Sequence, residues 1–154
     1  YWKIYTKSDT IEPQYIAPEA YIEKSIIGEA SEIYGTVINS VIGPNVQIGR
    51  GTVVRDSIIM KNTTIGENCT IDKAIIAEEV EISDGVVMGI GEEVPNKVQP
   101  KIYSFGLVTI GENSYIPPNV KIGKNTAIAG DTTPDDYNEG VLASGETLIK
   151  VGER

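Results

Sequence analysis

The chain has 154 residues, enough for one domain with an apolar core or one repeat array but not for two independent domains. Its net charge of −9 argues against a nucleic-acid groove or an anionic membrane as the main partner. The absence of histidine excludes a histidine-containing triad, and the single cysteine excludes an internal disulfide framework. One free cysteine fits a reducing compartment, and no apolar run approaches a membrane span, so we expect a cytoplasmic protein without a membrane segment.

Residues 1–15 are interpreted as a junction that follows another part of a larger protein. The sequence begins without Met on the letters YWKIYT, whose aromatic side chains would need an apolar surface to cover them. The alternative interpretation is a trimmed chain with a frayed end. The fragment interpretation is the one that we carry forward.

Residues 16–130 contain large aliphatic side chains at a repeated spacing. Three consecutive stretches of 17 residues, 39–55, 56–72 and 73–89, align with one another. This period is neither helical nor strictly alternating, and fixed self-similarity predicts a solenoid whose units bury their apolar faces by stacking. Within each stretch the spacing is six, six and five, and the aligned residues are Ile42, Ile48, Val54, Ile59, Ile65, Ile71, Ile76, Ile82 and Met88.

The corners of the predicted coil are marked by residues that tolerate positive φ. Gly51, Asn68 and Gly85 occupy one aligned column, and small residues share the columns between the large aliphatics. A six-residue unit of this kind makes one flat side of a three-sided coil. Four pairs of opposite charge would then stack on neighbouring coils, namely Arg50 with Glu67, Arg55 with Asp72, Asp56 with Lys73, and Lys61 with Glu78.

Three interruptions divide the array. The step from Ser25 to Ser40 is 15, so one early coil is two residues short. Residues 90–108 lack the pattern and contain two prolines, which predicts a loop that leaves the coil before the spacing resumes at residue 110. Residues 131–154 are expected to form a C-terminal tail, with a possible short strand at 146–151.

Groups for catalysis or cofactor binding are missing from the pattern. The acidic pairs at 78–79, 92–93 and 135–136 are more typical of solvated faces than of metal sites. The Gly-x-Gly pieces at 49–51 and 89–91 lack the third glycine of a dinucleotide loop and are assigned to turns. We therefore predict no catalytic, cofactor-binding or metal residue in this chain.

The repeated phrase resembles the hexapeptide repeat of left-handed β-helices. It reads IGPNV at 42–46, IGRGT at 48–52, IGENC at 65–69 and IGKNT at 122–126. The resemblance implies an all-β fold, a left-handed parallel β-helix with one excursion loop and a C-terminal tail. Acyltransferases with this repeat generally use a histidine base and γ-class carbonic anhydrases bind metal through three histidines, so neither site can be carried over here.

A closer resemblance is to the carboxy-terminal domain of bacterial glucose-1-phosphate adenylyltransferase. It rests on WKIYT at 2–6, PQYIAP at 13–18, DGVVMG at 84–89 and GVLASGETLIK at 140–150. That family makes ADP-glucose and pyrophosphate from ATP and glucose 1-phosphate for glycogen synthesis, on a nucleotidyltransferase domain that precedes the β-helix. The resemblance therefore implies that ATP and Mg²⁺ bind in the preceding domain and that residues 1–15 are the junction from it.

The resemblance implies a noncatalytic domain for oligomerisation and regulation. Its partners would be the catalytic domain in cis, further copies in an expected tetramer or a sister subunit, and a sugar-phosphate or anion regulator. Arg50 and Arg55 are the candidate residues for the regulatory anion, although both have acidic residues in the neighbouring coil. Two alternatives stay open, a free-standing acyltransferase with a lysine or glutamate base and a purely structural solenoid.

Overall fold

The structure is a computed structural model that describes residues 1–3 and 10–150. Part of the expected junction (residues 4–9) and the last residue of the expected strand (residue 151) lie outside the described residues. Short parallel strands joined by turns and loops form the described chain, and the only described helix is the 3-10 turn η1 (Pro134–Asp136). The predicted all-β class is confirmed.

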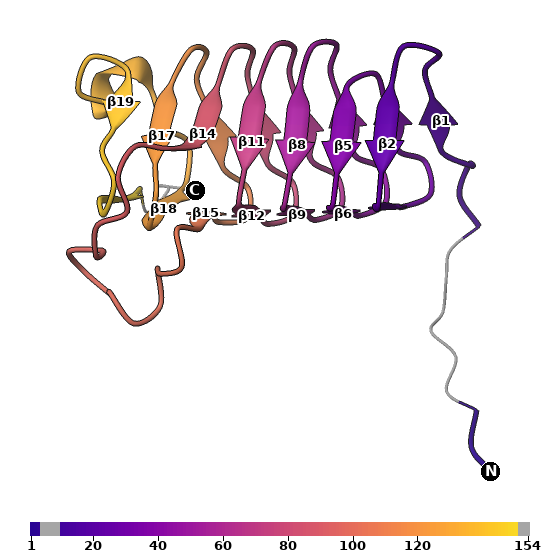
Figure 1. Ribbon diagram of the computed structural model, residues 1–154, viewed down its shortest axis with the longest axis horizontal. Coiled ribbons are helices and arrows are strands. Elements are labelled where there is room, and N and C mark those ends of the chain that lie inside the picture. Colours follow the sequence, from indigo (N-terminus) through magenta and orange to yellow (C-terminus); the bar gives the residue numbers. More distant parts are fainter. Residues whose placement is uncertain (4–9, 151–154) are drawn as a thin grey trace.

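The strands form three parallel sheets that close into a prism (Figure 1), because successive strands in the chain join successive sheets. Sheet A contains β1 (Tyr15–Ile16), β4 (Glu32–Ile33), β7 (Gln47–Ile48), β10 (Thr64–Ile65), β13 (Glu81–Ile82) and β16 (Tyr115–Ile116). Sheet B contains β2 (Tyr21–Glu23), β5 (Thr36–Ile38), β8 (Val53–Arg55), β11 (Thr70–Asp72), β14 (Val87–Ile90), β17 (Lys121–Gly123) and β19 (Val141–Leu142). Sheet C contains β3 (Ile26–Ile27), β6 (Val41–Ile42), β9 (Ile58–Ile59), β12 (Ala74–Ile76), β15 (Val108–Ile110), β18 (Thr126–Ala129) and β20 (Thr147–Ile149). This architecture confirms the predicted β-helix, and the left hand is the one that the hexapeptide resemblance implies.

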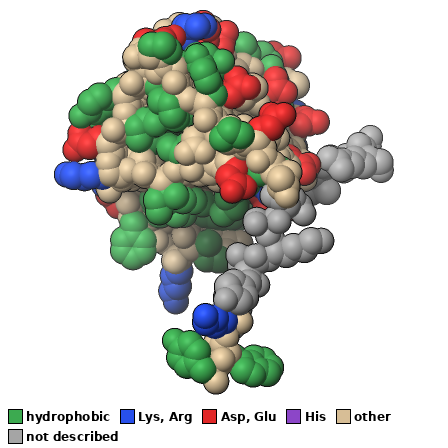
Figure 2. All heavy atoms as spheres, turned by 90° about the vertical axis from the view of Figure 1, so that its right-hand side faces the viewer, with side chains coloured by type: hydrophobic (Ala, Val, Ile, Leu, Met, Phe, Trp, Pro, Cys, Tyr) green, Lys and Arg blue, Asp and Glu red, His purple; other side chains and the backbone are tan. Residues whose placement is uncertain are grey.

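The core is a set of aliphatic columns on the axis of the prism. Ile48, Ile65 and Ile82 pair in register on sheet A, and each has at most 1% of its surface exposed. Equivalent columns line the inside of the other two sheets. Because each buried isoleucine contributes roughly 1.5–3 kcal/mol relative to an exposed one, these columns dominate the stability of the fold. Hydrophobic side chains also gather on the lower side of the prism when it is viewed along its length (Figure 2).

The corners use the left-handed backbone conformation that the sequence predicts. Gly51, Asn68 and Gly85 have φ of 71°, 55° and 72°. A Cβ on Gly51 would lie 2.3 Å from Oδ1 of Asn68, so this corner also needs a residue without a side chain. Asparagine accepts positive φ at lower cost than most residues because its amide can bond locally. At another corner, Nδ2 of Asn45 donates to Oδ1 of Asn62 at 2.9 Å and links two coils.

The expected short coil is confirmed and has a definite place. Tyr15 pairs with Glu32, a step of 17, whereas Tyr21 pairs with Thr36, a step of 15. The two missing residues therefore belong to the corner between sheets A and B, which in this coil contains only Tyr34 and Gly35. A Cβ on Gly35 would lie 2.4 Å from the carbonyl oxygen of Thr52, so the shortened corner rests directly on the next coil.

One of the four expected charge pairs is formed between the described residues, and the other three are not. Nζ of Lys61 lies 3.3 Å from Oε2 of Glu78, which confirms that pair. Arg50 is paired with Glu19 instead of Glu67, because the shortened corner of the coil between them brings the two side chains together. Among the described residues, Arg55 has no carboxylate within ion-pair distance, although Asp72 lies opposite it in register. The expected pair of Asp56 with Lys73 is not formed either. Asp56 instead accepts a hydrogen bond from Nδ2 of Asn39 at 2.6 Å.

The coil continues beyond residue 130, where the sequence analysis ends it. β19 extends sheet B and β20 extends sheet C, and β20 falls inside the stretch for which a strand is expected. Leu142 and Leu148 keep the spacing of six residues. The intervening segment folds back over the end of the prism, where Tyr137 is 6% exposed and its hydroxyl lies 2.8 Å from Oγ1 of Thr132.

Candidate functional site

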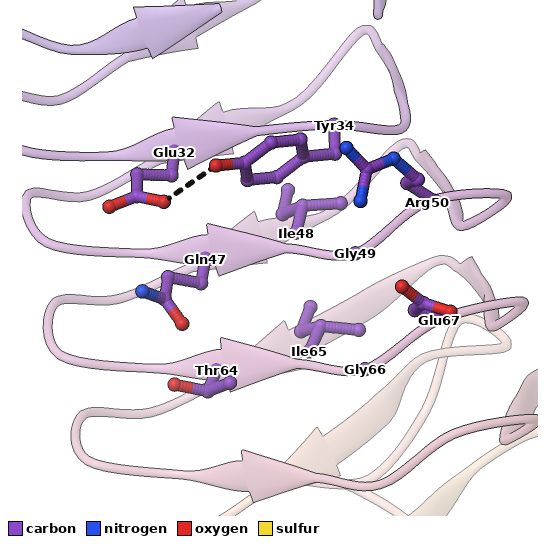
Figure 3. A pocket seen from close by; sticks show the side chains of 10 residues that line it. All are labelled: Glu32, Tyr34, Gln47, Ile48, Gly49, Arg50, Thr64, Ile65, Gly66 and Glu67. Atoms are coloured by element: carbon purple, nitrogen blue, oxygen red, sulfur yellow. Dashed lines mark hydrogen bonds between the residues drawn. The ribbon is translucent and has the colours of Figure 1, made fainter. Parts of the chain in front are cut away.

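Arg50, the first candidate residue, lies over the shortened corner between sheets A and B (Figure 3). Its guanidinium carbon is 5.0 Å from the centre of the Tyr34 ring, and its Nε donates to Oε1 of Glu19 at 3.0 Å. The ring of Tyr15 packs against that of Tyr34 with centroids 5.8 Å apart. The missing corner residues leave room for this stack, so the deletion in the coil creates the site.

Carboxylates surround the one cation of this site. The Tyr34 hydroxyl donates to Oε2 of Glu32 at 3.0 Å, and this hydrogen bond raises the pKa of Tyr34. The pKa of Glu19 is lowered, first by a hydrogen bond from its backbone amide and then by Arg50. Glu32 and Glu67 line the same hollow of about 260 Å³. An anion would therefore have to displace Glu19 from Arg50 in a region rich in negative charge.

Arg55, the second candidate residue, lies at the other end of β8. Four residues separate it from Arg50, and one of them, Gly51, turns the corner between sheets A and B with φ of 71°. The two arginines thus lie at different corners of the prism. The structure does not bring them into one site.

Groups capable of covalent or metal chemistry are scarce in the described part of the chain. Cys69 is fully buried, and burial raises the pKa of its thiol, which suppresses the reactive thiolate. The described ranges contain no group of three or more His, Cys, Asp or Glu side chains that could hold a metal ion. No helix in these ranges is long and apolar enough to cross a bilayer.

Sheet C presents a surface that the sequence analysis missed. Ile26, Val41, Ile58 and Ile75 point outward from β3, β6, β9 and β12 and stand opposite one another in register. Ile26 is 68% exposed, and Val41 and Ile58 are each 44% exposed. We call these four side chains the apolar face. It lies on the lower side of the prism in Figure 1, where the row of β6, β9 and β12 is seen edge-on.

The positions that directly follow these strands are uncharged. They hold Gly28, Gly43, Met60 and Ala77. Exposed hydrophobic residues are normal when they are scattered, but a continuous apolar patch marks a place of contact. The apolar face is therefore a second candidate functional surface, beside the Arg50 corner.

A signal for the apolar face is present in the sequence. Each of its strands carries two adjacent large aliphatics, as in Ile26-Ile27 and Ile58-Ile59. Neighbouring residues of a strand point to opposite sides, so only one of each pair can enter the core. Counting the inward spacing alone left the second residue of each pair unexplained.

Comparison with known proteins gives the family. Residues 14–110 match the family described as GlmU-like, C-terminal hexapeptide. The chain is 61% identical over 99% of its length to a glucose-1-phosphate adenylyltransferase of Lachnospira eligens, and 40% identical over 99% to one of Acetivibrio thermocellus. It covers 36% of each of these relatives and matches their C-terminal third.

Solved structures offer a more distant likeness. A hexapeptide transferase family protein from Anaplasma phagocytophilum shares 16% identity and a TM-score of 0.43, over 89% of this chain and 74% of that chain. That likeness is too remote to bear on function. The family match, by contrast, covers the coils that the register defines from β1 to β15. This chain therefore belongs to the GlmU-like C-terminal hexapeptide family.

Proposed function

We propose that the chain is the noncatalytic oligomerisation and regulatory module of a glucose-1-phosphate adenylyltransferase. The observation that carries this proposal is the 61% identity to a relative of that name, of which the chain covers 36%. The reaction forms ADP-glucose and pyrophosphate from ATP and glucose 1-phosphate, in the context of glycogen synthesis.

The chemistry of this reaction is assigned to the part of the protein outside this chain. ATP and Mg²⁺ would bind there, in a catalytic domain joined to the β-helix in cis. The described residues offer no cluster of metal ligands, and the only cysteine is buried, so we assign no step of the reaction to them. The role left to the module is to hold parts of the enzyme together.

The proposed assembly is a homo-oligomer, expected to be a tetramer, or a complex with a sister subunit, in the cytoplasm. The continuous apolar face supports a role in contact, because such a patch is costly to leave in water. A net charge of −9 keeps the remaining surface well solvated.

The proposed regulator is a sugar phosphate or another anion, with Arg50 and Arg55 as candidate contacts. Among the described residues Arg55 has no carboxylate within ion-pair distance, whereas Arg50 is held by Glu19, so we expect Arg55 to contribute more. Titration of the longer polypeptide with sulfate and with sugar phosphates tests this. The response measured is the change in the rate of pyrophosphate release on adding the anion. Arg55→Ala should weaken this change, and Arg50→Ala should weaken it less. An unchanged response in both variants contradicts the assignment.

The experiment on the proposed activity compares the longer polypeptide with residues 1–154 alone. We expect the longer polypeptide to release pyrophosphate from ATP and glucose 1-phosphate, and this chain alone to release none. The same samples are given acetyl-CoA and acceptor sugars. Acyl transfer by residues 1–154 would support the acyltransferase alternative, and inactivity of the longer polypeptide in both assays would support a structural solenoid.

A further inference from the structure

We propose that a groove along the corner between sheets A and B binds a neutral oligosaccharide. The groove joins two hollows, one of about 260 Å³ beside β7 and one of about 530 Å³ beside β13, and both are lined by Thr64 and Gly66. The inference goes beyond the proposed function, because it assigns a ligand to the β-helix itself and does not depend on the reaction.

Two rows of side chains form the sides of the groove. The first row stands in register on sheet A and consists of Glu32, Gln47, Thr64 and Glu81. The second row lies at the corner that follows and consists of Arg50, Glu67 and Asp84. Figure 3 shows the groove between the side chains of Gln47 and Thr64 in the first row and Arg50 and Glu67 in the second. Carboxylate, amide and hydroxyl groups are mixed in the first row, so it can both donate to a ligand and accept from one.

The floor between the two rows is free of side chains on two neighbouring coils. Gly49 and Gly66 directly follow β7 and β10 and line the hollows. A Cβ on Gly49 would lie 2.5 Å from the carbonyl oxygen of Gly66, and a Cβ on Gly66 would lie 2.3 Å from Oδ1 of Asp84. The stacking of the coils therefore requires glycine at both positions, and a ligand can approach the backbone there.

A tyrosine closes the groove at each end. Tyr34 occupies, one coil earlier, the floor position that Gly49 has in the next coil. At the far end Tyr115 belongs to the first row on β16, and its hydroxyl lies 3.1 Å from Oγ of Ser83, so its side chain reaches across to the floor. The open part of the groove thus spans the coils of β7, β10 and β13.

The spacing of the coils suits a chain of sugar rings. Neighbouring coils lie about 4.8 Å apart, which is close to the length of one hexopyranose unit. A linear saccharide along the groove would therefore meet an equivalent pair of side chains at each unit. Sugar hydroxyls donate and accept hydrogen bonds, and the two rows offer both kinds of partner. The three open coils have room for about three sugar units at this spacing.

The charges of the groove favour a neutral ligand over an anion or a basic peptide. Arg50 is the one cation among the residues that line the two hollows, and its guanidinium is already paired. An anion would face an excess of carboxylates. A basic peptide would be attracted by them, but Oδ1 of Asp84 already accepts from the amide of Glu67 at 2.7 Å. The uncharged Gln47 and Thr64 occupy the middle of the first row, where a neutral ligand needs hydrogen bonds more than charge.

A binding titration with matched variants of the longer polypeptide tests the proposal. Saturation-transfer NMR measures the binding of maltoheptaose, which has α-1,4 linkages, and of cellohexaose, which has β-1,4 linkages. Thr64→Arg places a long side chain where the two hollows meet. Thr70→Arg is the matched control, since Thr70 is an exposed threonine on the next strand of the same coil, on sheet B. Gln47→Leu keeps the size of the side chain and removes its amide, and it replaces Thr64→Arg if circular dichroism shows that the latter does not fold.

We expect at least one of the two saccharides to bind with a Kd of about 1 mM or lower. Thr64→Arg should weaken this binding by about tenfold or more, and Gln47→Leu by about threefold or more, while Thr70→Arg stays within about twofold. The affinity should be the same at about 0.05 and 0.5 M salt, because the ligand carries no charge. The saccharide that binds more tightly identifies the linkage that the groove accepts.

Two results would overturn the proposal. The first is no binding of either saccharide, or binding that Thr64→Arg and Gln47→Leu leave unchanged. The second is binding of pentalysine, lost in high salt, by a groove that binds neither saccharide, which would assign the groove to a basic peptide. Neither measurement uses pyrophosphate release, so failure of this proposal and failure of the proposed function are distinguishable.

Discussion

Sheets A and C have the same kind of inward column but present opposite surfaces to solvent. Isoleucines fill the inward positions of β4, β7, β10 and β13 on sheet A and of β6, β9 and β12 on sheet C, and each is at most 1% exposed. The outward positions of β4, β7, β10 and β13 on sheet A hold Glu32, Gln47, Thr64 and Glu81. The matching positions of β6, β9 and β12 on sheet C hold Val41, Ile58 and Ile75.

This difference indicates that the residues at the inward and outward positions of this fold are under different constraints. The inward columns must fill the prism on every side, because each coil buries its apolar residues only against its neighbours. The outward positions need only suit a flat parallel sheet, which polar and aliphatic side chains both do. They can therefore differ from one side of the prism to another, and they are mainly polar on sheet A and aliphatic on sheet C.

Inward substitutions should have the largest effect, and the effect should be equal on the two sheets. Ile59→Ala on sheet C and Ile65→Ala on sheet A should each lower the free energy of unfolding by about 2–5 kcal/mol, because both leave a cavity in the aliphatic core. Urea denaturation followed by circular dichroism measures the change. The outward neighbours Ile58→Ala and Thr64→Ala serve as controls and should cost far less. If Ile58→Ala costs as much as Ile59→Ala, the assignment of the apolar face is wrong.

A substitution at the corner that joins the two sheets should have the second largest effect on the free energy of unfolding. Asn62 has φ of 57° and accepts from Nδ2 of Asn45. Asn62→Ala should lower the free energy of unfolding by about 1–2 kcal/mol, since alanine pays the cost of the left-handed conformation. Asn62→Gly relieves that strain and loses only the side-chain bond, so its cost should be smaller. Thermal unfolding compares the two variants, and equal losses would show that the bond, not the backbone, sets the cost.

A charge placed on the outer surface of each sheet should show the difference between sheets A and C directly. Ile58→Glu puts a carboxylate in the middle of the apolar face, and Thr64→Glu puts one at the matching position of sheet A. Both should change the free energy of unfolding by less than about 1 kcal/mol, because both side chains point to solvent. Fluorescence of an apolar dye bound to residues 1–154 should fall with Ile58→Glu and stay unchanged with Thr64→Glu. A fall in neither variant would mean that sheet C is not the dye-binding surface.

The sequence predicts the parts of the molecule that depend on repetition. The spacing of Ile42, Ile48 and Val54 identifies the three sides of a coil, and Gly51 identifies a corner. Both follow from local chemistry that recurs in every coil, because stacking requires the same residue types at the same positions. The continuation through Leu142 and Leu148 was missed, since the segment that caps the prism separates it from the earlier repeats.

The candidate sites were harder to predict because they depend on departures from the repeat. Arg50 was matched with Glu67 one coil away, but the two-residue deletion at Tyr34 and Gly35 lets it reach Glu19 two coils away. The apolar face was missed because a count of inward residues says nothing about the outward neighbour. In both cases the result depends on contacts between coils, which a pattern read within one coil does not describe.

The smallest predicted effect concerns pH and sharpens the contrast between charged and uncharged sides. The pKa of Glu19 is lowered in the folded chain by its backbone hydrogen bond and by Arg50, so the ionised form stabilises the fold. That contribution is complete above the ordinary glutamate pKa of about 4.3 and is lost as pH falls through the lower folded value. Glu19→Gln should therefore give a small decrease in Tm at pH 7 that disappears below that range and shrinks in high salt, as expected for an exposed pair. The decrease caused by Ile58→Ala should not vary with pH between these limits, because neither isoleucine nor alanine has a side chain that titrates. Scanning calorimetry of both variants across this range decides the matter, and a Glu19→Gln difference that persists in acid would mean that the carboxylate acts through packing and not through its charge.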